Sequence, residues 1–245
     1  MGRICPGTVT PLLALLVKMQ DSLTFAAGPL REAPMKASMA KHTTNYPPDL
    51  TLEELYNAET ECRRCPLYSP ATQVVPGQGA DSAHLMLVGE QPGHEEDLQG
   101  LPFVGPAGRM LDKALEEAGI DRRRVFVTNA VKHFKFEQRG KRRLHKRPNG
   151  YEIDRCRWWI DMERAIIKPK VVVALGATAA RSLLGKSVSI SSVRGDTLMQ
   201  SDGTRLVVTI HPSYLLRIKD ADDKAREYRR FVDDLRSGKE AMRSA

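Results

Sequence analysis

Cysteine is scarce in this sequence, with four residues among 245, at positions 5, 62, 65 and 156. So few thiols cannot supply the disulfide framework on which small secreted proteins depend. Reduced thiols or metal ligands are therefore the better interpretations of these residues. Repeats at the spacing of solenoid proteins are also lacking, which excludes an array of stacked units.

Long apolar runs are absent as well, and the one stretch that resembles a membrane signal runs from Val9 to Val17. This stretch is too short to cross a bilayer, and Pro11 interrupts it. A signal-peptide core is one alternative interpretation. An overlong start is another, because Met35 and Met39 stand just before the first clearly patterned segment. We expect a cytoplasmic protein with no membrane partner.

Acidic residues are outnumbered, with 30 Asp and Glu against 38 Lys and Arg, a formal charge of +8 and a pI near 9.4. An excess of positive charge favours polyanionic partners, because each neutralised phosphate releases counterions. Charge alone does not identify a nucleic acid as the partner. The length and the hydrophobic content of 41% suit one α/β domain with a real core. We expect this domain to be a monomer.

Residues 1–48 show no sustained periodicity, and we expect a poorly ordered N-terminal extension followed by a domain over residues 49–240. Short apolar runs in this domain predict four buried strands, at residues 85–88, 125–127, 171–175 and 206–210. Longer segments predict helices, the first capped by Thr51 and the others at residues 106–119, 151–167, 177–184 and 221–236. This alternation indicates an α/β fold of three αβα layers around a central, mainly parallel four-stranded sheet.

Glycine, proline and polar residues follow the first predicted strand, in Gly89-Glu90-Gln91-Pro92-Gly93 and in Gly100-Leu101-Pro102-Phe103-Val104-Gly105. The ligands of a parallel sheet bind beyond the carboxyl ends of its strands, where this segment lies. Its glycines allow the backbone to approach a ligand closely. Taken alone, the segment is equally compatible with a solvated turn. Phe103 is likewise compatible with a core aromatic residue.

Asn129 follows the second predicted strand, and His211-Pro212-Ser213 follows the last one. An amide side chain donates and accepts hydrogen bonds at once, and a histidine can stabilise developing negative charge. An asparagine in a turn and a proline at a helix start are the ordinary alternatives.

In this order the motifs resemble those of the iron-sulfur uracil-DNA glycosylases, over about residues 51–237. The resemblance implies that Phe103 stacks on a flipped uracil, that Asn129 reads its edge and that His211 stabilises the charge on uracil O2. It also implies a uracil pocket lined by Gly89, Glu90, Gln91, Phe103, Asn129 and Ser213.

Cys62 and Cys65 form half of a metal site, and two thiols cannot complete it. Cys156 is a further candidate ligand. In the family, a cysteine after an Asn-x-x-Lys segment completes the set, and His133 stands at that place here. The UdgX-like branch shows the same replacement, so the resemblance implies a 4Fe-4S cluster on Cys62, Cys65, His133 and Cys156. Zinc is the alternative, because the ligand types do not separate the two groups.

Residues 139–147 hold six Lys or Arg in nine positions, a charge run that predicts a solvated loop in contact with phosphate. We expect its DNA-backbone contacts to be Lys141, Arg142, Arg143 and Lys146. The segment Lys141-Arg142-Arg143-Leu144-His145 resembles the insertion of UdgX proteins, in which a loop histidine captures the sugar.

This second resemblance implies that His145 attacks C1′ after uracil departs, and that Glu90 orients or deprotonates it. The flanking cations are expected to keep His145 neutral. His94 departs from the branch, whose members carry Asp at this place.

The expected function is therefore a single-turnover uracil-DNA glycosylase that forms a covalent adduct with its substrate. We expect single-stranded DNA, in which unpairing costs nothing. A conventional turnover glycosylase is one alternative, opposed by His133 and by the basic insertion. A noncatalytic iron-sulfur protein that binds nucleic acid is another, opposed by the pocket residues, since phosphate binding requires no base pocket.

Overall fold

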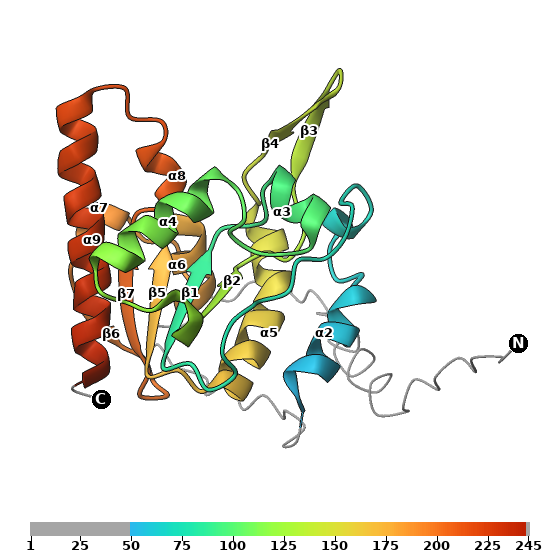
Figure 1. The fold of residues 1–245 in the computed structure, drawn as a ribbon. Helices are drawn as coiled ribbons and strands as arrows, with labels where there is room; N and C mark the ends of the chain where they lie inside the picture. Colours follow the sequence, from blue (N-terminus) through green and yellow to red (C-terminus); the bar gives the residue numbers. More distant parts are fainter. Residues whose placement is uncertain (1–49, 244–245) are drawn as a thin grey trace, which may run out of the picture. The chain divides into compact units, whose positions relative to one another are not determined.

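The structure is a computed structural model and describes residues 50–243. The extension expected over residues 1–48, and Cys5 with it, lies outside this range. The described residues belong to one structural unit built on a sheet of five strands, in the order β2-β1-β5-β7-β6 (Figure 1). Adjacent pairs among β2, β1, β5 and β7 are parallel.

The four parallel strands are β1 (Leu85–Gly89), β2 (Val125–Asn129), β5 (Val171–Leu175) and β7 (Arg205–Thr209). They confirm the four strands predicted from apolar runs. The edge strand β6 (Thr197–Met199), which pairs antiparallel with β7, was not predicted. Its residues are exposed or half-exposed, so β6 lacks the apolar run that marks a buried strand.

The α-helices of the described residues are α2 (Leu52–Thr60), α3 (His94–Gln99), α4 (Pro106–Glu117), α5 (Gly150–Ile167), α6 (Ala177–Leu184), α7 (Ile190–Val193), α8 (Pro212–Leu215) and α9 (Ala221–Arg243). Short 3-10 turns lie at η1 (Pro66–Tyr68) and η2 (Arg122–Arg124). The predicted capping box at the start of α2 is present, with Thr51 and Glu54 each bonded to the other's backbone N–H.

Two apolar cores lie on opposite faces of the sheet, because successive strand residues point to opposite sides. Leu87 and Val173 belong to the core that α4 and α9 complete. Met86 and Val172 belong to the core that α5 and α6 complete. The predicted three-layer αβα arrangement is therefore confirmed, and Figure 1 shows α9 standing along one edge of the unit.

A β-hairpin occupies part of the predicted basic loop. Its strands are β3 (Phe136–Arg139) and β4 (Arg142–His145), which pair antiparallel, with Phe136 opposite His145. Gly140 turns the chain at φ 57°, a conformation that glycine adopts without strain. The hairpin projects beyond the carboxyl edge of the sheet (Figure 1). Within residues 50–243, no helix has the length and apolar character needed to cross a membrane.

Candidate functional site

The predicted site residues gather where the parallel strands end. Gly89 is the last residue of β1 and lies beside Asn129, the last residue of β2. The backbone N–H of Ala130 donates to the Gly89 carbonyl at 2.9 Å, which continues the strand pairing past these two residues. His211 lies two residues beyond the end of β7. The expected position at the carboxyl edge of the sheet is therefore the observed one.

Gly89, Asn129 and the Phe103 ring meet at one place on this edge, which we call the recess. A Cβ atom on Gly89 would lie 2.3 Å from Asn129 Oδ1 and 2.6 Å from Phe103 Cζ, so only glycine fits there. The rings of Phe103 and His211 are nearly parallel, at 28°, with centroids 6.2 Å apart. An amide and an aromatic ring thus meet at Gly89, and an imidazole lies beside the aromatic ring, which are the groups that bind a planar heterocyclic ligand.

Phe103 is held in the left-handed backbone region, at φ 60°. Such a conformation is costly for an aromatic residue and persists only where the surroundings impose it. The carbonyl of Phe103 lies so close to the backbone of Gly108 in α4 that a Cβ at Gly108 would be 1.6 Å from it. Phe103 is buried, which matches a core aromatic as well, but its ring lies against the recess and not only within the core.

His211 caps α8, and its Nδ1 accepts the backbone N–H of Ser213 at 3.2 Å. The Ser213 hydroxyl lies 2.8 Å from the same nitrogen. Burial, together with the charges of His145 and Arg217, lowers the pKa of His211 to about 4. His211 is therefore neutral near pH 7, and because Nδ1 accepts, its single proton lies on Nε2. This Nε2–H group is free to donate to a ligand.

Glu90 and His145 approach each other from β1 and the hairpin. Glu90 Oε1 lies 3.7 Å from His145 Nε2, and the Thr178 hydroxyl donates to Glu90 Oε2 at 2.5 Å. Arg147 Nε lies 3.6 Å from the same carboxylate oxygen. Burial lowers the pKa of His145, and Arg217 lowers it further, against the opposite effect of Glu90. The expectation of a neutral His145 agrees with this direction, but the causes are burial and Arg217 and not the flanking cations.

Gln91 holds the hairpin and does not extend its amide into the recess. Its Nε2 donates to the carbonyls of Lys135 and Lys146, at 3.0 and 3.1 Å, and lies 3.0 Å from His145 Nε2. Its Oε1 accepts the backbone N–H of Lys135 at 3.3 Å. The amide nitrogen has two hydrogens for three acceptors, so the contact with His145 shares a hydrogen with one carbonyl; in that arrangement Nε2 of a neutral His145 accepts and Nδ1 carries the proton.

Arg143 joins the hairpin to α3. Its guanidinium lies 2.6 Å from Asp97 Oδ2, 3.0 Å from the Thr72 hydroxyl and 2.7 Å from His94 Nδ1. Only 14% of its side chain is exposed, and that of Asp97 is fully buried. Arg143 is thus an internal ion-pair partner, unlike the free surface cation that was expected at this position. His94, the residue that departs from the motif, is part of the same contact.

The other expected phosphate contacts are on the outer part of the hairpin. Lys141 and Arg142 are exposed. Lys146 is 58% exposed and forms an ion pair with Glu137 at 3.1 Å. These three cations are accessible to a polyanion, in contrast with Arg143.

The four expected metal ligands come from three separate segments and are all buried. Cys62, Cys65 and Cys156 are free thiols, and their mutual proximity contributes to the raised pKa of Cys156, which is caused mainly by burial. The Trp159 indole N–H donates to Cys62 Sγ at 3.2 Å. Burial lowers the pKa of His133 to about 4, so its imidazole is neutral, as a metal ligand requires.

Among residues 50–243, no three His, Cys, Asp or Glu side chains converge closely enough to hold a single metal ion. Tetrahedral zinc, with Zn–S bonds of about 2.3 Å, requires ligand sulfurs roughly 4 Å apart. The donor set, three thiols and one neutral imidazole, suits iron-sulfur chemistry.

Two site residues were not predicted, Thr178 and Arg217. Thr178 bonds to Glu90 from the first turn of α6, directly after β5. Because ligands of a parallel sheet bind beyond the carboxyl ends of its strands, the position of Thr178 after a predicted strand could have marked it as a site residue. Arg217 acts on both histidines from the segment after α8, and no local pattern marks it.

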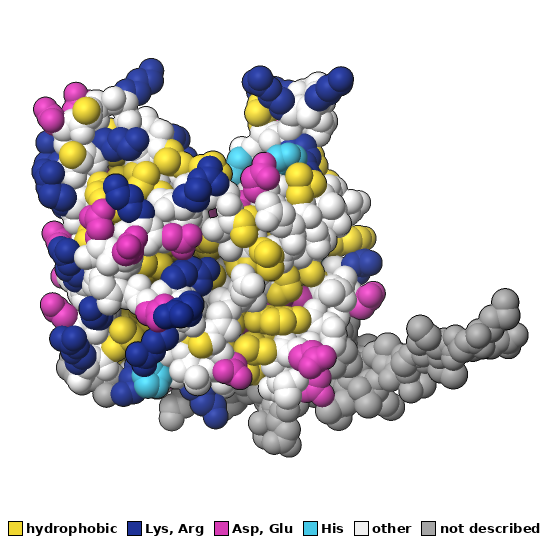
Figure 2. Space-filling view, in the orientation of Figure 1, with side chains coloured by type: hydrophobic (Ala, Val, Ile, Leu, Met, Phe, Trp, Pro, Cys, Tyr) yellow, Lys and Arg dark blue, Asp and Glu magenta, His cyan; other side chains and the backbone are white. Residues whose placement is uncertain are grey.

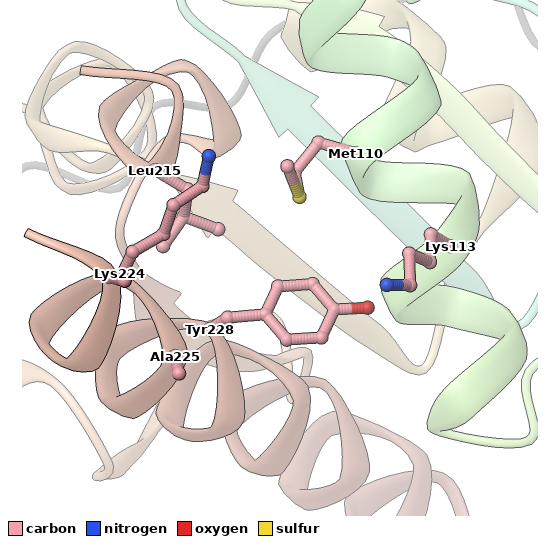
Figure 3. Close-up of a pocket in the computed structure, with 7 residues that line it drawn as sticks. Met110, Lys113, Leu215, Lys224, Ala225 and Tyr228 are labelled. Atoms are coloured by element: carbon pink, nitrogen blue, oxygen red, sulfur yellow. The ribbon is translucent and has the colours of Figure 1, made fainter. Parts of the chain in front are cut away.

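Two pockets lie outside the cluster of predicted site residues, and one of them includes Phe103. One, of about 430 Å³, is lined by Gln78, Pro102, Phe103, Val104, Arg109, Asp112, Arg122 and Arg123. The other, of about 250 Å³, lies between α4, α8 and α9, with Tyr228 between Lys113 and Lys224 (Figure 3). This second pocket contains none of the predicted site residues.

Comparison with known proteins identifies the group to which these motifs belong. The profile of the uracil DNA glycosylase superfamily matches residues 76–236. A type-4 uracil-DNA glycosylase of Thermotoga maritima is 39% identical over 195 residues, which cover 77% of this chain and 95% of that protein. A type-4 uracil-DNA glycosylase of Pyrobaculum aerophilum is 32% identical, over 69% of this chain and 86% of its own length.

A type-5 uracil-DNA glycosylase of Pyrobaculum aerophilum is more distant, at 27% identity over 66% of this chain and 83% of its own length. The profile match covers most of the described residues and includes the strand ends that carry Glu90, Asn129 and His211. This chain belongs to the uracil DNA glycosylase superfamily.

Proposed function

We propose that this protein removes uracil from DNA and then remains attached to the sugar through His145. The observation that carries the proposal is the position of His145, whose Nε2 lies 3.7 Å from Glu90 at the edge where the base recess opens. His145 also acts electrostatically on His211, whose ring stacks near Phe103, so the two histidines belong to one site. A hairpin that only bound phosphate would not need a contact between His145 and Glu90.

In this proposal uracil enters the recess above Gly89 and stacks on Phe103. Asn129 hydrogen-bonds to the O4 and N3–H edge, which requires both a donor and an acceptor. The Nε2–H of His211 donates to O2. Support comes from the burial of Asn129, from the ring geometry of Phe103 and His211, and from the acceptor role of His211 Nδ1.

The bond between C1′ and uracil N1 breaks first, and its electron pair leaves with uracil as charge that His211 stabilises at O2. The Nε2 lone pair of His145 then forms a bond to the cationic C1′, in exchange for its hydrogen bond to Gln91. The resulting imidazolium loses its Nδ1 proton to solvent. Glu90 orients the ring and stabilises the positive charge that passes through this region.

We further propose that Cys62, Cys65, His133 and Cys156 hold a 4Fe-4S cluster with a structural role. The cluster would supply a rigid link among α2, the β2–β3 connection and α5. The burial of all four donors supports a metal site, and three thiols with one neutral imidazole suit iron-sulfur chemistry. Zinc without iron in the native protein would contradict this assignment.

The substrate that fits best is single-stranded DNA, because a base that is already unpaired enters the recess at little cost. A protein that remains bound after one reaction is also suited to exposed single strands. We propose a monomer in the cytoplasm, where the three buried thiols stay reduced.

A turnover glycosylase is the second candidate, favoured by the type-4 names of the most similar relatives reported above. Replacing His145 with Ser separates the two functions. We expect His145→Ser to abolish the denaturation-resistant adduct while uracil release continues, because water then occupies the vacated position. Both products are measured in one reaction with a uracil-containing single-stranded oligonucleotide.

The matched control is His84→Ser, an exposed histidine at the opposite end of β1, which should leave both products unchanged. An adduct that persists in His145→Ser would exclude His145 as the nucleophile. Loss of uracil release together with the adduct would instead make His145 necessary for bond breaking. Release without any adduct in the unchanged protein would identify a turnover enzyme.

A further inference from the structure

The pocket of about 430 Å³ beside the base recess is an open groove with a basic lining. Pro102, Phe103 and Val104 form one wall, so a single short segment borders both the recess and the groove. The lining also includes three arginines against one aspartate. None of these arginines belongs to the hairpin, and the reaction proposed above does not use them.

The arginines of this groove are available to a ligand. The side chain of Arg109 is exposed and forms no hydrogen bond or ion pair with any residue between 50 and 243. Arg123 is 89% exposed, although two of its nitrogens bond to Asp121. Arg122 forms an ion pair with Asp112 at 3.3 Å, which neutralises the one carboxylate of the lining. Ion pairs this exposed are worth little and are readily exchanged.

Figure 2 shows the surface hollowed between the hairpin and the opposite rim over α4 and α8. Lys and Arg side chains continue from this hollow down the face over α4. The hairpin carries the other group of exposed cations, Lys141, Arg142 and Lys146. The base recess therefore lies between two basic surfaces that belong to different elements.

We propose that the groove of Arg109, Arg122 and Arg123 binds the DNA backbone on one side of the uracil, while the hairpin contacts the other side. This inference rests on the proposed function, since it names the path of the same substrate. A flipped nucleotide stays joined to both neighbours, so its strand must leave the recess in two directions. The groove shares the Phe103 wall with the recess. Its arginines therefore line the path by which the DNA strand leaves the recess on the α4 side.

Arginine suits this task because its planar fork pairs with phosphate oxygens and remains charged at every relevant pH. Interactions of this kind position the strand without reading its sequence. The groove should therefore act on affinity, and the chemical step should not depend on it.

The experiment measures uracil release under single-turnover conditions for the double variant Arg109→Gln, Arg122→Gln. With an oligonucleotide that extends on both sides of uracil, we expect half-saturation to require about fivefold to tenfold more protein at 0.15 M salt, with an unchanged maximal rate. The slope of log affinity against log salt should become shallower by about 0.7 for each single-strand phosphate that the double variant no longer neutralises.

Oligonucleotides shortened on one side of uracil make the test specific. Removing the flank that lies in the groove should weaken binding to the unchanged protein but have almost no further effect on the double variant. Removing the other flank should weaken binding to both proteins equally. Whichever of the 5′ and 3′ flanks shows this coupling is the one in the groove.

Arg229→Gln is the matched control, because Arg229 is also an exposed arginine without a partner in the described residues, but it is on α9. Arg109→Lys should retain more affinity than Arg109→Gln, because the lysine keeps the positive charge. Affinity unchanged in the double variant, or effects that add for both flanks, would overturn the inference. No uracil release from the unchanged protein would instead overturn the proposed function.

Discussion

Both histidines of the site are neutral because of where they lie in the fold. His211 is half-buried with its ring stacked near that of Phe103, and its Nδ1 accepts the N–H of Ser213. Protonation at Nδ1 would break this cap and place a charge in a half-buried position. Desolvation and the charges of His145 and Arg217 lower the pKa of His211, and the Ser213 cap fixes its tautomer.

The pKa of about 4 at His211 predicts the acid limit of uracil release. Since the folded pKa lies below the usual 6.5, the neutral form persists as the pH falls from 8 to about 5, and release should stay constant over this range. It should decline near pH 4, where His211 gains a proton. Single-turnover uracil release, with circular dichroism at each pH to monitor folding, measures this profile.

The same shift has a consequence for stability. Between about pH 6.5 and 4 the unfolded chain binds a proton at this position and the folded chain does not. The contribution of His211 to stability is therefore complete above pH 6.5 and is lost as the pH falls toward 4. A release profile with its midpoint near 6.5 would show that His211 is solvated like a model histidine.

At the scale of elements, the β3–β4 hairpin is the part that the site adds to an ordinary α/β sheet. Its base is bonded through Gln91 to Lys135 and Lys146, and its side through Arg143 to Asp97. The Arg143 guanidinium also lies 5.4 Å from the centre of the Phe134 ring. These contacts determine where His145 points, so Arg143 is a positioning residue for the proposed capture.

Arg143→Gln tests this role against its neighbour Arg142→Gln. Loss of a charge-assisted hydrogen bond costs about 1.5–3 kcal/mol, so the hairpin of Arg143→Gln should spend more time undocked and the adduct-to-release ratio should fall by about tenfold or more. Arg142→Gln, which removes an exposed cation, should weaken salt-dependent binding and leave that ratio unchanged. Equal ratios in the two variants would contradict the positioning role.

At the scale of the whole molecule, a buried lysine connects the segments that carry the proposed cluster ligands. Lys132 is fully buried, with its Nζ 2.5 Å from Glu163 on α5 and 3.8 Å from Glu59 on α2. Its backbone N–H donates to Cys156 Sγ at 3.2 Å. Burial raises the pKa of Glu59 to about 8, and neither oxygen of Glu59 has a hydrogen-bond partner in the described residues.

Lys132→Met should therefore destabilise the fold by about 3–5 kcal/mol, because it leaves the buried Glu163 carboxylate without its cation and Lys132 no longer bridges Glu163 and Glu59. The midpoint of urea unfolding measures this change, and adding Glu59→Gln and Glu163→Gln should recover part of the stability. Lys113→Met, which removes an exposed ion pair with Glu117, should change stability by less than about 1 kcal/mol. Similar destabilisation in the two lysine variants would show that the buried network contributes little.

The order of strands and helices could be read from local pattern. Runs such as Val171–Leu175 are apolar at every position. This pattern is typical of a strand that is covered on both faces of the sheet. The edge strand β6 escaped prediction because it is stabilised by pairing with β7 and not by its own apolar residues. The hairpin was not predicted for the same reason. Arg142–His145 has the composition of a charged loop, and its strand structure depends on pairing with Phe136–Arg139.

The sequence by itself determined the sheet, the family motifs and the residues that gather at the carboxyl edge, because strand periodicity and short motifs are local properties. Only the tertiary structure decided what each side chain does there. It pairs Arg143 with Asp97, bonds Gln91 to the hairpin and lowers the pKa of His145 through burial and Arg217. Charge pairing and desolvation depend on distances between segments far apart in the chain, which no local pattern specifies.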